Sequence, residues 1–485
     1  MPLVIETFHS SKTPWEVFQA VYADSQTCFF LDSPHYAPPD QVYSYIGMDP
    51  SLEIRLDRDG LHIKGEECGK YPADELFPML RKILKKYQIS PRSARPFFAG
   101  GFVGYFGYES ADLCDKIKFR TKPAPDAPHV YFALFRDVIV YDHKKKVYYL
   151  ARQNASKACG VRRAKKIKTY FKNSIGRKGK PFKLKKFTAE MTKERFQSMV
   201  EKAKDYIAAG DIYQANLSQR FSFGYEGSSL ALYGKLRAIN PSPFSCFLKT
   251  GDLEIVSSSP ERLILKKGRV CETRPIAGTC PAHGPARQFV AWRKKLLQNE
   301  KEKAEHLMLV DLERNDLGRV CDYRSVKVRE FMTLERYSHV VHIVSKVTGH
   351  LQKGKDALDV IQALFPGGTI TGCPKIRCME IIDELEPVRR GVYTGSLGYI
   401  DLCGDMDLNI VIRTMLLRKG KGHLQVGAGI VNDSDPEKEY EETLHKARAL
   451  ISALVFASSE KGVRRTSYSA GIFSPHSVPR TLYQS

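Results

Sequence analysis

The chain has 485 residues, of which 42% are hydrophobic, and it carries a formal net charge of +22 at pH 7. This length predicts about two or three domains or one large interleaved domain with a substantial core. No apolar run approaches the ~18 residues of a membrane-spanning helix, and we expect no signal peptide. The eleven cysteines form no CxxC pair, which predicts free thiols in a reducing, cytoplasmic compartment.

Short alternating runs of apolar and polar residues dominate the first 150 residues. Residues 52–56 alternate in this way, and residues 138–141 and 147–150 flank a turn and predict a β-hairpin. Residues 73–87 have helical periodicity. Residues 98–108 hold four glycines among aromatics, but no helix start follows, so we interpret them as a strand and packing turn, not a nucleotide loop. This region is therefore predicted to be mixed α+β with mainly antiparallel strands.

Basic residues crowd the segment 162–186, which contains no acidic residue. We interpret it as a solvated basic linker. The alternative, a nucleic-acid-binding arm, lacks any accompanying zinc-finger, homeodomain or RNP pattern, so no nucleic-acid partner is expected. The chain is divided into an N-terminal region (1–160), the basic linker (161–187), a catalytic domain (188–457) and a disordered tail (458–485).

The catalytic region alternates helices with strands, which again predicts α+β. Helices are expected at 193–209, 300–311 and 374–385. Strands are expected at 215–223, 247–248, 253–257, 262–266, 326–331, 344–349, 395–400, 408–417 and 424–428. A small-residue turn at 427–429 precedes a helix start at Asp435-Pro436, and such a turn lets an anion approach backbone N–H groups.

Paired carboxylates mark two of these helices. Glu439 and Glu442 are three residues apart and share a face with Lys446, and Glu302 and Glu305 repeat the spacing. Carboxylates on one face repel each other unless a cation lies between them. The pattern predicts an oxygen-ligated divalent metal that holds an anionic substrate.

Six short motifs occur in a fixed order along this half of the chain. They are RPIAGT (274–279), HLMLVDLERNDLGR (306–319), FPGGTITGCPK (365–375), DLNIVIRT (407–414), GAGIV (427–431) and DPEKEYEETLHK (435–446). Together they resemble the chorismate-utilising enzymes, which include anthranilate synthase, aminodeoxychorismate synthase, isochorismate synthase and salicylate synthase. The resemblance is strong over residues 190–455 and weaker over residues 28–143. It implies an α+β fold in which antiparallel β-sheets flanked by helices form one large interleaved chorismate-binding unit.

The resemblance also assigns roles to individual residues. Glu305, Glu439 and Glu442 are expected to hold Mg²⁺, with Glu302 nearby. Glu261 matches the general acid for loss of the C4 hydroxyl, and His342 matches the histidine beside the substrate ring. The expected substrate contacts are Gly278, Thr279, Thr369, Tyr393, Arg413, Gly427, Ala428, Gly429 and Lys446. Arg413 is expected to grip one substrate carboxylate bidentately.

Gln214 indicates which nucleophile is used. The water-using family members that this chain resembles carry a lysine base there, whereas an amide takes no proton at neutral pH. We therefore expect ammonia to be the nucleophile. The chain lacks the G-x-C-x-G glutaminase motif, so ammonia is expected from glutamine through a separate glutamine amidotransferase subunit.

Two amination products remain open, and different segments favour each. FPGGTITGCPKIR and NPSPFSCFL resemble the folate branch, in which aminodeoxychorismate synthase component I makes 4-amino-4-deoxychorismate for 4-aminobenzoate. Ala277 resembles the tryptophan branch, in which anthranilate synthase component I makes anthranilate and pyruvate. The two longer segments favour the folate branch. A possible effector site, only loosely similar to the tryptophan-feedback motif, is expected at Asp32, Ser33, Pro243, Phe244 and Ser245.

Overall fold

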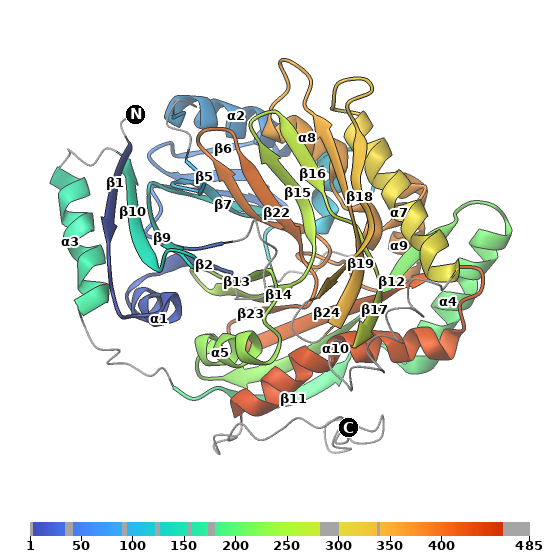
Figure 1. Cartoon of the computed structure of the whole chain (residues 1–485). Helices are drawn as coiled ribbons and strands as arrows, with labels where there is room; N and C mark the ends of the chain where they lie inside the picture. The colour runs from blue at the N-terminus through green and yellow to red at the C-terminus, as the bar shows by residue number, and fades with distance from the viewer. Residues whose placement is uncertain are drawn as a thin grey trace.

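The computed structural model describes residues 3–33, 42–89, 95–121, 127–153, 158–172, 180–281, 300–336 and 340–458. Two antiparallel sheets of twelve strands each form the body of the molecule, with helices against their outer faces (Figure 1). The α+β class and the antiparallel pairing predicted from the sequence are confirmed. The predicted tail lies outside the described residues, except for Ser458.

The first sheet contains strands from both the beginning and the end of the sequence. Its strands, in spatial order, are β1 (Leu3–Phe8), β10 (Val147–Gln153), β9 (Asp137–Asp142), β3 (Tyr43–Met48), β2 (Thr27–Asp32), β13 (Phe244–Thr250), β14 (Leu253–Ser259), β23 (Thr414–Arg418), β24 (Lys421–Ile430), β12 (Gln214–Glu226) and β11 (Lys183–Ala189), with β20 (Gly372–Cys373) paired to β12.

The second sheet also combines strands from the first and second halves of the chain. Its strands, in spatial order, are β17 (Ile276–Pro281), β19 (Val340–His350), β16 (Val270–Thr273), β15 (Arg262–Lys267), β22 (Met406–Ile410), β21 (Ser396–Asp401), β7 (Gly101–Phe106), β8 (Val130–Phe135), β4 (Leu52–Asp57), β5 (Gly60–Gly65) and β6 (Gly69–Tyr71), with β18 (Lys327–Arg336) paired to β19.

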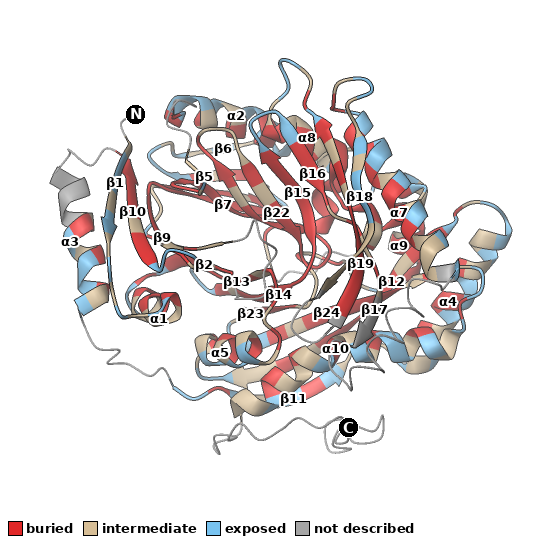
Figure 2. Ribbon diagram, in the orientation of Figure 1, coloured by how far each residue is buried: buried red, intermediate tan, exposed pale blue. Residues whose placement is uncertain are grey.

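Most helices bury one face and leave the other exposed, as the pale-blue outer surfaces in Figure 2 show, whereas α8 has no exposed residue. They are α1 (Pro14–Asp24), α2 (Leu76–Tyr87), α3 (Ala158–Lys172), α4 (Lys193–Ala208), α5 (Ser229–Ile239), α7 (Glu300–Gly318), α8 (Ala357–Leu364), α9 (Lys375–Leu385) and α10 (Pro436–Ser458). Short 3₁₀ turns lie at Ala73–Glu75, Tyr108–Leu113 and Gly368–Ile370. Within the described residues, no helix is long and apolar enough to cross a membrane.

Four apolar clusters hold these layers together. One lies between the sheets and joins Phe29 of β2 to Val103 of β7. The helices α1, α3, α5 and α10 pack on the first sheet, and α2, α7 and α8 pack on the second. The last cluster joins α4 and α9 to β12 and β24, the strands that carry Gln214 and residues 427–429. The carboxylate-bearing helices are therefore fixed to the sheets by buried side chains. The prediction of a turn at 427–429 is wrong, because these residues lie inside β24 and pair with residues 216–218 of β12.

In each sheet the strands of the 1–160 region lie side by side and join the block of later strands at one pair. β2 pairs with β13, and β7 pairs with β21, so the 1–160 and 188–457 regions share one core. The segment predicted as a basic linker, 161–187, contains most of α3 and the start of β11. Cations of α3 pair with acids of the N-terminal strands and turns, as Lys166 does with Asp49 at 2.8 Å. Much of the basic segment is thus folded against the first sheet.

One predicted strand is two strands, which corrects the expectation of a single strand at 408–417. β22 ends at Ile410 in the second sheet and β23 begins at Thr414 in the first. Between them Arg413 has φ 50°, a left-handed conformation that a continuous strand does not allow. The chain therefore passes from one sheet to the other at this residue. The unbroken apolar pattern hid the break because both flanking segments are buried.

Candidate active site

Gln214 and Glu305 face each other between β12 and α7. The Gln214 side-chain Nε2 donates a hydrogen bond to Glu305 Oε1 at 3.2 Å. Gly429 on the paired strand β24 makes this possible, because a Cβ there would lie 2.5 Å from Gln214 Nε2. Burial, Glu302 and Glu442 raise the pKa of Glu305, while the Gln214 hydrogen bond opposes them. The structure thus brings the carboxylates of α7 and α10 close to each other.

Lys446 links the helix α10 to the small-residue end of strand β24. Its Nζ donates to the Gly427 carbonyl oxygen at 2.9 Å and lies 2.8 Å from Glu442 Oε1. The Glu442 contact follows from the i,i+4 spacing on a helix. Lys446 also lies close enough to lower the pKa of both Glu261 and Glu305. This ammonium therefore connects the carboxylate cluster with the predicted acid.

The donor set at α7 and α10 suits a hard divalent cation. Glu305 and Glu442 are mutually repulsive, as the raised pKa of Glu305 records, and only oxygen donors are offered. Glu439 is buried on the same face, and its Oε1 accepts a hydrogen bond from the Ser434 hydroxyl at 2.7 Å. The oxygens of Glu305, Glu439 and Glu442 are more widely spread than 4.8 Å. Among the described residues, only Asp57, Asp59 and His62 have potential metal-ligand atoms that all lie within 4.8 Å of one another, and Asp59 is exposed. A metal at the three glutamates would need their side chains to turn inward.

Glu261 lies between β14 and β15, where its carboxyl is almost completely buried. Burial raises its pKa to about 7, and the nearby Thr369, Lys446 and Arg413 side chains pull it down. Thr369 belongs to the 3₁₀ turn Gly368–Ile370. A buried carboxyl with a pKa near neutrality is able to hold a proton for transfer. Glu261, Thr369, Arg413 and Lys446 are thus brought together, as the sequence predicted.

His342 lies on β19 opposite β17. Its Nδ1 is 3.2 Å from the Gly278 carbonyl oxygen, and its backbone is paired with Thr279, whose side chain lies outside the described residues. Burial, with help from Arg413, lowers the pKa of His342 to about 4. The imidazole is therefore neutral at physiological pH. Gly278 has φ 60°, which explains a glycine at this bulge in the strand.

Arg413 owes its position to the sheet crossover described above. Its backbone oxygen accepts a hydrogen bond from the Ser258 backbone N–H at 3.1 Å, which fixes the turn beside β14. Burial lowers the pKa of its guanidinium, while Glu261 raises it. A partly desolvated guanidinium, with a neutral histidine and a carboxyl of raised pKa as neighbours, is a suitable receptor for a carboxylate.

Tyr393 lies against Gly427 of strand β24. Its hydroxyl oxygen would lie 2.9 Å from a Cβ placed on Gly427, so only a glycine permits this approach. Ala428 between the two glycines is fully buried, and its side chain packs against α4 and α9. Only its backbone is therefore positioned to meet a ligand.

Two residues of this region were missed by sequence reasoning. Glu313 is buried on α7, and burial together with Asp316 raises its pKa to about 8. Arg390 is fully buried between α9 and Tyr393. Glu313 lies inside the motif at 306–319, and Arg390 lies three residues before the predicted substrate contact Tyr393. A charge next to a motif does not reveal from sequence that it is buried.

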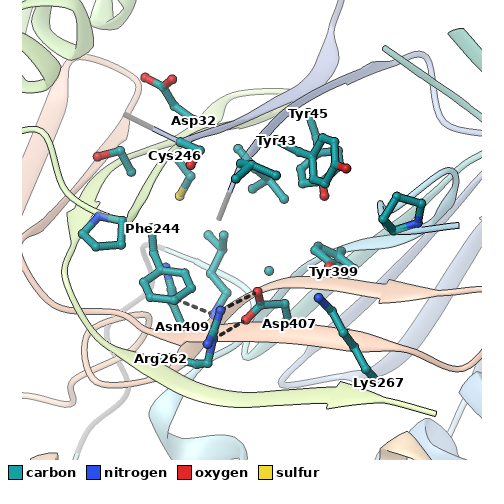
Figure 3. A pocket seen from close by; sticks show the side chains of 18 residues that line it. Asp32, Tyr43, Tyr45, Phe244, Cys246, Arg262, Lys267, Tyr399, Asp407 and Asn409 are labelled. Atoms are coloured by element: carbon teal, nitrogen blue, oxygen red, sulfur yellow. Dashed lines mark hydrogen bonds and ion pairs between the residues drawn. The ribbon is translucent and has the colours of Figure 1, made fainter. Parts of the chain in front are cut away.

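The five residues of the possible effector site do line one cavity, between the two sheets (Figure 3). It measures about 80 Å³, and Tyr43, Tyr45 and Tyr399 form its aromatic wall. Asp32 accepts a hydrogen bond from Arg237 Nε at 2.8 Å. On the floor, Arg262 is held by Asp407 at 3.0 Å. The structure thus brings these residues together without identifying a ligand.

A wider cleft of about 760 Å³ opens beside Gln214, between α7 and α9. Its wall includes Tyr213, Leu307 and Ile376, which are all exposed apolar residues. Sequence reasoning missed this cleft because its lining comes from separate elements.

Comparison with known proteins agrees with this geometry. The family model described as chorismate binding enzyme matches residues 26–452. The chain is 42% identical over 429 residues to aminodeoxychorismate synthase component 1 of Bacillus subtilis, covering 87% of this chain and 91% of that protein. It is 39% identical over 478 residues to anthranilate synthase component 1 of Aquifex aeolicus, covering 95% and 96%. The crystal structure of anthranilate synthase component I from Streptococcus pneumoniae aligns with a TM-score of 0.76 at 33% identity, covering 87% and 93%.

Proposed function

Because the chain belongs to the chorismate-binding enzymes, we propose that it is an aminodeoxychorismate synthase component I. In this proposal it aminates chorismate, with ammonia from a glutamine amidotransferase partner, to give 4-amino-4-deoxychorismate. The product keeps the enolpyruvyl group and leads to 4-aminobenzoate and folate. The 42% identity to the Bacillus subtilis protein supports this choice.

The observation that carries amination is the Gln214–Glu305 hydrogen bond. An amide side chain that donates to a carboxylate has no basic atom with which to deprotonate water. Ammonia needs no such base, because its lone pair is already available. The Gln214 side chain therefore favours ammonia over water as the nucleophile.

The remaining residues have separate roles in displacing the hydroxyl from the anionic substrate ring. Arg413 binds one substrate carboxylate, and the neutral His342 packs beside the ring without adding charge. Glu261 holds its proton on a buried carboxyl oxygen and delivers it to the departing C4 hydroxyl, which leaves as water. Lys446 adds positive charge next to the bound anion.

We propose Mg²⁺ as the cofactor, held by Glu305, Glu439 and Glu442. Bound there, it would supply positive charge that neutralises these glutamates and binds one substrate carboxylate. The oxygen-only donor set and the raised pKa of Glu305 support this assignment. Gln214 keeps the Glu305 side chain oriented toward β24.

A separate amidotransferase subunit is part of the proposal. Both relatives are named component 1, which implies that each works with a second component. We also propose a cytoplasmic location, because the nine described cysteines are all free thiols, as predicted.

Anthranilate synthase component I is the second candidate, and Ala277 favours it. This residue lies buried on β17 beside Gly278, where it offers no amine to form a covalent adduct with the substrate. The Aquifex aeolicus relative covers more of the chain than the Bacillus subtilis relative does.

Product identity tests the proposal. The purified chain is incubated with chorismate, Mg²⁺ and ammonium, and the products are resolved by liquid chromatography and mass spectrometry. A product that keeps the enolpyruvyl group, and that an added lyase converts to 4-aminobenzoate, supports the proposal. Anthranilate plus pyruvate, formed without a lyase, would establish the second candidate instead.

A further inference from the structure

Arg390 is a fully buried guanidinium just outside the substrate contacts described above. Taking a guanidinium out of water is unfavourable unless it is paired and all its N–H groups are bonded. Glu386, four residues earlier, supplies the counter-charge through Nε–Oε2 and Nη2–Oε1 contacts of 3.0 and 2.7 Å. The pair is bidentate and therefore has one geometry.

The other three N–H groups of Arg390 reach three separate segments. Nη1 donates to the Ile370 carbonyl oxygen at 2.9 Å and to the Thr394 hydroxyl at 3.3 Å. Nη2 donates to the Asn216 carbonyl oxygen. All five donors of the guanidinium are thus used, and no other side chain presents five donors in a fixed plane.

Each of these segments carries a residue of the candidate active site. Ile370 follows Thr369, Thr394 follows Tyr393, and Asn216 lies two residues after Gln214 on β12. The guanidinium also lies 5.8 Å from the centre of the Tyr393 ring. One side chain therefore fixes the relative positions of three parts of the site that are distant in sequence.

Glu386 and Glu109 extend this arrangement on either side. Glu386 Oε1 accepts hydrogen bonds from the Ser218 N–H and hydroxyl, both at 2.8 Å, which fixes β12 a second time. Glu109 Oε1 accepts a hydrogen bond from the Arg390 backbone N–H at 2.8 Å, and Glu109 Oε2 accepts one from Gly391 at 3.0 Å. The segment 390–394, which carries Tyr393, is thus held by hydrogen bonds from both its backbone and the Arg390 side chain.

We propose that Arg390 is a positioning residue, which orients Thr369, Tyr393 and Gln214 toward the substrate. This inference rests on the proposed function for the roles of those residues. A buried ion pair contributes little net stability compared with apolar residues of similar volume, so stability alone does not account for five directed bonds. Small displacements of groups around a bound substrate strongly reduce turnover.

The test compares variants that keep the fold but lose the five-bond geometry. Arg390→Lys keeps the charge and loses the planar fork, whereas Arg390→Met combined with Glu386→Gln removes the pair and keeps an acceptor for Ser218. The control is Arg95→Lys, which disturbs another largely buried pair, with Asp401, that is not bonded to these three segments. All are assayed as full chains with chorismate, Mg²⁺ and ammonium, below the onset of melting recorded by circular dichroism.

We expect kcat/KM of Arg390→Lys to fall about 100-fold, with about a tenfold rise in KM, while Arg95→Lys stays within about threefold of wild type. If Arg390→Lys does not fold, the double variant carries the same expectation. A folded Arg390 variant within about threefold of the wild-type kcat/KM and KM would overturn the proposal.

Calorimetric titration measures the Kd for chorismate and so tests the positioning role of Arg390 separately from the proposed amination. A wild-type chain that binds chorismate without aminating it refutes the proposed function and leaves the role of Arg390 testable through Kd. Weaker binding by a folded Arg390 variant then supports the positioning role. A wild-type Kd in that variant counts against it.

Discussion

Replacing Glu261 by Gln tests the proposed acid directly. The amide keeps the shape of the side chain and loses its proton-donating group. Burial raises the pKa of Glu261 to about 7, so about half of the molecules carry the proton at neutral pH. At the ordinary value of 4.5, roughly 0.3% would carry it at the same pH. The buried environment thus increases the fraction of active acid by more than about 100-fold.

The expected loss follows from this role. We expect kcat/KM of Glu261→Gln to fall by about 10²–10⁴-fold, the usual contribution of a positioned acid. The acid must be protonated to act, so wild-type kcat/KM declines as pH rises through about 7, the pKa of Glu261. This decline should be absent from the variant.

The assay follows chorismate consumption at constant un-ionised ammonia across the pH series, so that ionisation of the nucleophile does not shape the profile. Glu254→Gln, on the neighbouring strand β14 and bonded to Tyr22, is the matched control and should keep the wild-type profile. A Glu261→Gln variant with wild-type kcat/KM, or with the same decline near pH 7, would refute the assignment.

Three further outcomes are expected. Chelation by EDTA should abolish amination, and added Mg²⁺ should restore it. Glu305→Gln should be inactive with an unchanged circular dichroism spectrum. Full activity after chelation or in this variant contradicts the metal assignment. Arg413→Lys should raise KM for chorismate about 10- to 100-fold in steady-state kinetics, because a lysine cannot grip a carboxylate bidentately, and an unchanged KM would argue against that contact. Phe18→Ala should lower the free energy of unfolding by about 3–5 kcal/mol in a urea titration, since Phe18 is fully buried against Phe30; a loss below about 1 kcal/mol would show that the cavity collapses.

Local features of this fold could be predicted from the sequence because their signals are local. Residues 138–150 form the predicted hairpin, and α10 begins at Pro436 as its start signal indicates. The 3.6-residue period placed Glu442 and Lys446 on one face, and they are in contact.

Other features depend on contacts that a one-dimensional pattern does not record. The sheet crossover at Arg413 has buried strands on both sides, so its hydrophobicity resembles that of one strand. The five bonds of Arg390 end on residues from 4 to 174 positions away in the sequence. Glu261 was proposed as the general acid through the family resemblance, since a carboxylate after a proline is otherwise typical of a surface turn. Its burial came only with the structure.

The pairing of an early strand with a late strand inside each sheet has a consequence for how the protein is made. Phe29 of β2 pairs with Leu248, and Gly104 of β7 pairs with Gly398, so each early residue is synthesised long before its cross-strand partner. Pairing between residues so far apart in sequence slows folding and leaves apolar strand edges uncovered on the nascent chain. A fragment that stops before β21 would expose the β7 edge permanently. The ribosome must therefore release nearly the whole polypeptide before the core is able to close.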